Sequence, residues 1–275
     1  NIILDYVFIF IFNLGVKGAA LATIISQAII FFIILYYYTI GNSNLKLKVE
    51  NFKLKKHLVT MTFAIGIAPF ATQIANSLVQ VIANNALKTY GSDLAIGAMT
   101  VISSLNIVFM MPIFGINQGC QPIIGFNYGA KKYKRAKETF KYATMAACVI
   151  CIIGFTIIQC FPTQIISLFN NDPKLTNLAM RGIRIYLLMM PIVGINIVAT
   201  SYYQSIGKAK ISMFVSLLRQ VILLIPFTII LPKFIGLDGV WAAGACADSL
   251  SVIITLILLR KEFKQLDKMQ LEAVA

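Results

Sequence analysis

The sequence is built from apolar runs of about 20 residues that are separated by short polar or basic stretches. A helix of this length spans the roughly 30 Å of hydrocarbon in a bilayer, because each residue adds about 1.5 Å. Of the 275 residues, 59% are hydrophobic and 12% are charged, whereas soluble domains have about 45–50% apolar and about 25% charged residues. The sequence therefore predicts an all-α integral membrane protein, a polytopic helical bundle, and excludes a soluble globular domain.

The apolar runs predict about eight membrane helices. We place them at residues 1–13, 17–40, 58–86, 93–118, 140–161, 177–205, 211–231 and 237–259. Four prolines fall inside these runs, where the missing N–H and the ring favour kinks: Pro69, Pro112, Pro191 and Pro226.

The basic residues indicate how the helices are oriented. The chain has 24 Lys and Arg against 10 Asp and Glu, and eighteen of the 24 lie in residues 41–57, 130–141, 207–219 and 260–275. Short cytoplasmic loops carry most of the Lys and Arg of a membrane protein, so we expect these stretches and the C-terminus to be cytoplasmic. A basic stretch beside a membrane helix fits contact with anionic lipid, and no nucleic-acid partner is predicted.

No enzyme chemistry is predicted from the sequence. It contains no nucleophile triad, P-loop or dinucleotide-binding fingerprint. Cys148 and Cys151 have the spacing of a metal-binding pair, but the partner pair and a nearby histidine are missing. We therefore expect no cofactor and no resident metal.

Two short connections between apolar runs resemble each other at an offset of 221 residues. Residues 15–22 and 236–243 share Gly15 with Gly236, Gly18 with Gly239, and Ala22 with Ala243. A repeat with this offset predicts two six-helix halves and about four further helices, roughly 170 residues, before Asn1. The expected layout is the last two helices of an N-terminal lobe (1–40), a cytoplasmic inter-lobe loop (41–57), a six-helix C-terminal lobe (58–260) and a cytoplasmic tail (261–275).

Two carboxylates fall within apolar runs, where ionisable groups are costly and usually functional. Asp5 lies one helical turn after Asn1, so that the two side chains share a face. A desolvated carboxylate can exchange a proton or bind Na⁺ with amide and hydroxyl oxygens, and Thr23 can supply such a hydroxyl. The alternative is a hydrogen bond between helices. Asp248, flanked by Ser249 and Ser251, fits either role.

A stripe of amides follows one face of the third predicted helix, and such a face avoids lipid. It either bonds to neighbouring helices or lines a wet cavity. Methionine and tyrosine side chains can form an adaptable cavity wall, although core packing is the alternative. The residues assigned to a candidate substrate cavity are Gln73, Asn76, Gln80, Asn84, Met110, Tyr186, Met189 and Asn196.

Four segments carry a resemblance to a known family. They are residues 1–5 (NIILD), 15–23 (GVKGAALAT), 117–130 (NQGCQPIIGFNYGA) and 202–209 (YYQSIGKA). With these, the chain resembles the multidrug and toxic compound extrusion (MATE) family, particularly its bacterial branch. The resemblance implies a two-lobe fold of twelve helices in the bacterial cell membrane.

The resemblance also implies a function. Members of the family export drugs or toxic organic cations in exchange for H⁺ or Na⁺, and the cation site of the N-terminal lobe falls on Asn1, Asp5 and Thr23. A further carboxylate of that site belongs to a first helix that this chain lacks. We expect a monomer whose partners are small molecules and the lipid bilayer.

Two other functions remain open from the sequence. One is a lipid-linked oligosaccharide flippase of the same superfamily, which needs cationic residues facing its cavity; the candidates are Arg181, Arg184 and Arg219. The other is an inactive truncated membrane fragment or scaffold.

Overall fold

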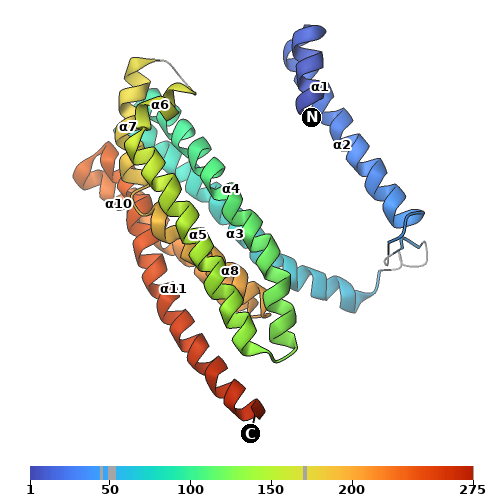
Figure 1. Cartoon of the computed structure of the whole chain (residues 1–275). Helices are drawn as coiled ribbons and strands as arrows, with labels where there is room; N and C mark the ends of the chain where they lie inside the picture. The colour runs from blue at the N-terminus through green and yellow to red at the C-terminus, as the bar shows by residue number, and fades with distance from the viewer. Residues whose placement is uncertain (44–45, 49–53, 170–171, 275) are drawn as a thin grey trace. The chain divides into compact units, whose positions relative to one another are not determined.

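The computed structural model describes residues 1–43, 46–48, 54–169 and 172–274, and the regular structure of these residues is helical (Figure 1). The chain divides into two compact units, Asn1–Thr62 and Phe63–Ala275. The first unit contains α1 (Ile2–Tyr6), the π-helical η1 (Val7–Ile11) and α2 (Gly15–Thr39). The second unit contains most of α3 (Lys56–Tyr90), followed by α4 (Asp93–Gly129), α5 (Tyr133–Cys160), α6 (Pro162–Ser167), α7 (Pro173–Tyr186), α8 (Met190–Ser205), α9 (Ala209–Leu217), the π-helical η3 (Leu218–Leu224), α10 (Ile225–Ile235) and α11 (Leu237–Val274).

The structure confirms an all-α polytopic membrane protein. Among the described residues, five helical segments are long and apolar enough to cross a membrane: Gly15–Thr39, Asp93–Gly129, Tyr133–Cys160, Ala209–Ile235 and Leu237–Met269. A sixth consists of α7 and α8, and the first apolar run forms the short helical segment Ile2–Ile11. The predicted helix at 58–86 falls within α3.

The predicted helix at 177–205 is broken. Its two parts, α7 and α8, are bent by 56°. Pro191 lies in the first turn of α8, where its ring and missing N–H prevent the helix from continuing back through residue 187. Pro226 similarly opens α10 directly after η3, whereas Pro112 lies inside α4. The side chain of Pro69 is not among those described.

The two connections of the predicted repeat have the same local geometry. Gly15 and Gly236 both have positive φ, +53° and +61°, and each lies where the following helix begins. Three residues later, a Cβ on Gly18 would lie 2.8 Å from the carbonyl oxygen of Phe8, and one on Gly239 would lie 2.6 Å from that of Leu231. In both places glycine therefore allows two helices to approach at a tight turn.

Small residues also let α7 pack against α11 in the second unit. A Cβ on Gly182 would lie 2.8 Å from the ring of Trp241, and one on Gly244 would lie 2.9 Å from the ring of Tyr186. Trp241 is fully buried. In this way the packing holds Tyr186, at the end of α7, against Gly244, which lies one helical turn before Asp248 on α11.

Ion pairs and aromatic rings join α5, α8 and α11 near the basic stretches. Lys208 Nζ lies 2.7 Å from Glu262 Oε2, and Lys137 Nζ lies 3.0 Å from Asp267 Oδ1. The rings of Phe140, Tyr202 and Phe263 pack edge to face beside these pairs, with centroids 5.2–5.9 Å apart: Phe140–Tyr202, Phe140–Phe263 and Tyr202–Phe263. The predicted tail 261–275 continues α11 as far as Val274, while Lys53 of the predicted loop 41–57 lies outside the described residues.

Candidate functional site

The first unit brings Asn1 and Asp5 together. Asn1 Nδ2 donates to Asp5 Oδ2 at 2.6 Å, and Ser26 Oγ of α2 donates to Asn1 Oδ1 at 3.2 Å. Asp5 is half-buried. These hydrogen bonds connect a carboxylate, an amide and a hydroxyl across α1 and α2. The Asp5 carboxylate forms no ion pair with any Lys or Arg side chain in the described part of the chain.

Thr23 points elsewhere in the structure. Its Oγ1 donates to the carbonyl oxygen of Ala19 at 2.9 Å, within the same helix, and the residue is exposed. The hydroxyl that joins the Asn1–Asp5 pair is instead that of Ser26, one helical turn further along α2. Sequence reasoning missed Ser26, although its spacing of three residues from Thr23 places it on a neighbouring part of the same face.

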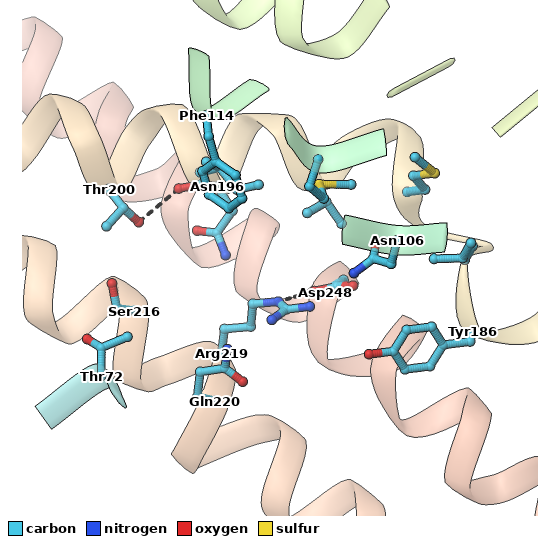
Figure 2. A pocket seen from close by; sticks show the side chains of 15 residues that line it. Thr72, Asn106, Phe114, Tyr186, Asn196, Thr200, Ser216, Arg219, Gln220 and Asp248 are labelled. Atoms are coloured by element: carbon cyan, nitrogen blue, oxygen red, sulfur yellow. Dashed lines mark hydrogen bonds and ion pairs between the residues drawn. The ribbon is translucent and has the colours of Figure 1, made fainter. Parts of the chain in front are cut away.

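The second unit contains a cavity of about 330 Å³ between α3, α4, α8, η3 and α11. Figure 2 shows the side chains that surround it. One part of the wall is apolar and another is polar. The lining residues are Thr72, Asn106, Met110, Phe114, Tyr186, Leu187, Met190, Val193, Asn196, Ile197, Thr200, Ser216, Arg219, Gln220 and Asp248.

Three of the predicted cavity residues line this cavity, namely Met110, Tyr186 and Asn196. Met189 does not, because the break between α7 and α8 presents Leu187 and Met190 to the cavity instead. Sequence reasoning did not assign Thr72, Asn106, Ser216 or Gln220 to the cavity.

The amide stripe of α3 lies outside the cavity. Asn76 Nδ2 donates to Gln73 Oε1 at 3.0 Å, and the remaining stripe residues, Gln80 and Asn84, are exposed. Ala75, two residues after Gln73 and therefore on the opposite side of α3, is 2% exposed. The cavity contact of α3 is Thr72, directly before the stripe.

An ion pair between Arg219 and Asp248 lies in the wall of the cavity. Arg219 Nε donates to Asp248 Oδ1, and Figure 2 shows the two side chains pointing toward each other. Arg219 belongs to the π-helical η3 and Asp248 to α11. A π-helical segment shifts the facing of the residues that follow and often occurs at functional sites. The two side chains thus place opposite charges against each other in the wall of the cavity.

The amide of Asn196 is held by a buried hydrogen-bond network. Asn196 Nδ2 donates to Ser251 Oγ at 2.8 Å, and Thr255 Oγ1 donates to Asn196 Oδ1 at 3.0 Å. Asn196 is 5% exposed, and both partners are fully buried. This network joins α8 to α11, so Asn196 shapes the cavity wall with an amide whose two ends are already bonded.

Only one of the three candidate arginines lines the cavity. Arg181 pairs with Asp238 near the start of α11, and the exposed Arg184 lies near the end of α7. Sequence reasoning noted Arg219 and Asp248 separately but did not pair them. The signal was present, since opposite charges in two apolar runs need partners.

Comparison with known proteins places this fold. A family model described as MatE matches residues 69–230. The multidrug export protein MepA of Staphylococcus haemolyticus (strain JCSC1435) is 29% identical over 261 residues, which cover 94% of this chain and 57% of that protein. MepA of Staphylococcus aureus (strain NCTC 8325 / PS 47) is 28% identical with the same coverage. The chain thus spans less than two-thirds of the length of these relatives.

Solved structures share the fold. A MATE crystal structure in the straight conformation has a TM-score of 0.87 at 20% identity and is matched over 97% of this chain and 60% of its own. A MOP superfamily transporter from Pyrococcus furiosus Vc1, reported with a binding pocket of reverse polarity, has the same TM-score, identity and coverage. At this identity the similarity shows the fold alone.

Proposed function

The chain belongs to the MatE family of membrane transporters, which are not enzymes, and we propose that it exports cationic or amphipathic small molecules in exchange for H⁺ or Na⁺. Relatives of this chain are named multidrug export proteins. Because the chain spans 57% of the length of these relatives, the activity is proposed for a full-length transporter that contains these helices. We also propose that it acts as a monomer in the bacterial cell membrane, with the basic stretches and the C-terminus cytoplasmic.

The observation that carries the proposal is the environment of Asp5. Its carboxylate lies in an apolar helical segment and is bonded to the neutral amide of Asn1. An amide and a hydroxyl do not cancel a negative charge, so a proton or Na⁺ can bind there. With Asn1 and Ser26 nearby, the site offers the hard oxygen donors that Na⁺ prefers and a carboxylate that H⁺ can neutralise.

Coupling requires that the ion and the drug favour different conformations or compete for one. A ligand shifts a conformational equilibrium only by its difference in affinity for the two states. The substrate is proposed to occupy the cavity of the second unit, where Met110, Phe114 and Tyr186 provide an apolar wall. A flippase that binds anionic lipid-linked sugars would need unpaired cationic side chains. Arg219, the single Lys or Arg among the described residues of the cavity lining, is paired with Asp248.

The experiment uses the complete reading frame in inside-out vesicles. Asp5→Asn should remove the drug-driven flux of the coupling ion, because the neutral amide cannot exchange a proton or bind Na⁺ with its charge. Flux is followed with a pH-sensitive dye and with labelled Na⁺, each with the other ion's gradient absent, so that the coupling ion is identified.

Asp93→Asn is the matched control, since Asp93 lies in the first turn of α4 and outside both sites. It should retain wild-type flux. Unchanged flux in well-expressed Asp5→Asn would rule out the proposed coupling site.

A further inference from the structure

The Arg219–Asp248 pair in the cavity is not explained by a coupling site at Asp5. The two side chains come from different helices, η3 and α11, and make their recorded hydrogen bond through Nε and Oδ1. Both residues line the cavity, so a ligand that enters it meets the pair directly.

The two members of the pair are unequally free to leave. The Asp248 side chain is 9% exposed and that of Arg219 is 25% exposed. Aspartate is short and fixed to α11, whereas arginine has a long flexible stem that can carry its charge to a wetter position. An unpaired buried charge is costly. Arg219 can therefore move away at low cost only when another cation takes its place beside Asp248.

The rest of the cavity suits the body of an organic cation. Phe114 and Tyr186 offer aromatic faces, which attract cations, and Met110 and Met190 offer adaptable apolar contacts. Asn196 has both ends of its amide bonded within the protein, so it competes little for the ligand's charge. Asp248 is the single carboxylate among the lining residues that the structure describes, which matches one positive charge on the ligand rather than two.

We propose that Asp248 binds the positive charge of a monovalent amphipathic cation in this cavity, and that Arg219 is a tethered competitor which occupies Asp248 until such a cation displaces it. Arg219 thereby keeps the empty cavity neutral and sets the affinity for the ligand. This inference rests on the proposed export function for its biological meaning, but it concerns binding alone.

The test compares two probes of the same shape and opposite charge, tetraphenylphosphonium and tetraphenylborate. Equilibrium binding is measured with the protein in lipid nanodiscs at pH 8, without an ion gradient, and is corrected for binding to empty discs. Arg219→Gln removes the competitor and should tighten tetraphenylphosphonium binding about tenfold or more, as charge pairs of this kind allow. Asp248→Asn should weaken it by a similar factor and improve binding of tetraphenylborate.

Two variants control for packing. Arg219→Lys keeps the competing charge and should bind tetraphenylphosphonium much as wild type does. Arg184→Gln makes the same change at an exposed arginine outside the cavity lining and should have no effect. If Arg219→Gln does not fold, Asp248→Asn with the two probes decides the question.

Three results would overturn the proposal. They are unchanged or weaker tetraphenylphosphonium binding in folded Arg219→Gln, unchanged binding in folded Asp248→Asn, or tighter binding of tetraphenylborate than of tetraphenylphosphonium by wild type. Because no gradient or flux is involved, a failure of the antiport experiment at Asp5 would leave this result unaffected, and the reverse also holds.

Discussion

Asp5 in the first unit and Asp248 in the second both lie within apolar helices, but their partners differ. Asp5 is bonded to the neutral amide of Asn1, which in turn accepts a hydrogen bond from Ser26. Asp248 is bonded to the cationic Arg219 and is more deeply buried. A carboxylate with neutral partners keeps a charge that a mobile ion can cancel, whereas a carboxylate with arginine is already neutralised. The comparison indicates an ion-binding role for the first and an exchange of cationic partners for the second.

The largest difference is expected in stability. Asp248→Asn leaves Arg219 without its counter-charge and should lower the free energy of unfolding by about 3–5 kcal/mol, the cost of breaking a buried ion pair from one side. Asp5→Asn removes a charge from a half-buried site with neutral partners, and should cost about 1 kcal/mol or less. Denaturation in mixed micelles, followed by circular dichroism, measures both.

The double variant Arg219→Gln/Asp248→Asn is the control for this difference. It removes both charges together and should recover more than half of the loss. Equal destabilisation by the two single aspartate variants would show that the distinction between the sites is wrong.

The two glycine connections should respond alike, in contrast to the two carboxylates. Gly18→Ala and Gly239→Ala each place a Cβ less than 3 Å from a backbone carbonyl, and should each destabilise by about 1–3 kcal/mol, as overpacking does. Gly119→Ala is the control, because no atom lies within 4 Å of its added Cβ; there alanine should stabilise the helix by about 0.5–1 kcal/mol. The same denaturation experiment measures these changes. If Gly239→Ala left the free energy of unfolding unchanged while Gly18→Ala lowered it, the two connections would not be equivalent.

Substitutions of polar side chains in the second unit should lower the free energy of unfolding more where the side chain is buried than where its partner is exposed. Asn196→Ala removes both bonds of the network with Ser251 and Thr255 and should cost about 1–2 kcal/mol. Asn76→Ala removes the bond to the exposed Gln73 and should change the unfolding free energy by less than about 0.5 kcal/mol. A larger effect at Asn76 would mean that the amide stripe is a packed interface.

The helices were predictable because bilayer thickness imposes one length and one composition on every membrane helix. A kink at Pro191 was predicted, but not a break at residues 187–189 that divides the helix in two, because the chain stays apolar through Leu187, Leu188 and Met189 while its direction changes. Pro191 carried the signal. The π-helical turn that holds Arg219 has no counterpart in hydropathy, which reports how apolar a segment is and not how its backbone is wound.

The candidate sites were predictable only in part, for a related reason. Periodicity identifies the face on which a side chain lies, but not the helix that this face meets. The amides of α3 do share a face, yet Ala75 on the opposite side of the helix is the buried residue there, and the cavity receives Thr72. Likewise Asn1 and Asp5 are paired by their spacing alone, whereas the partner supplied by α2 depends on how two helices are aligned.

The smallest expected effect tests that alignment. Ser26 Oγ donates to Asn1 Oδ1 and so orients the amide that bonds to Asp5, whereas the hydroxyl of Thr23 is bonded to Ala19 in its own helix. Ser26→Ala should therefore weaken binding of the coupling ion about threefold, the equivalent of one modest hydrogen bond. Thr23→Ala should leave it unchanged. Flux measured over a range of ion concentrations in vesicles gives both values. If Thr23→Ala weakens ion binding and Ser26→Ala does not, then α2 turns a different face toward Asp5 when the ion is bound. Asp5 would then exchange one neighbour on α2 for another, whereas Asp248 exchanges Arg219 for a ligand cation.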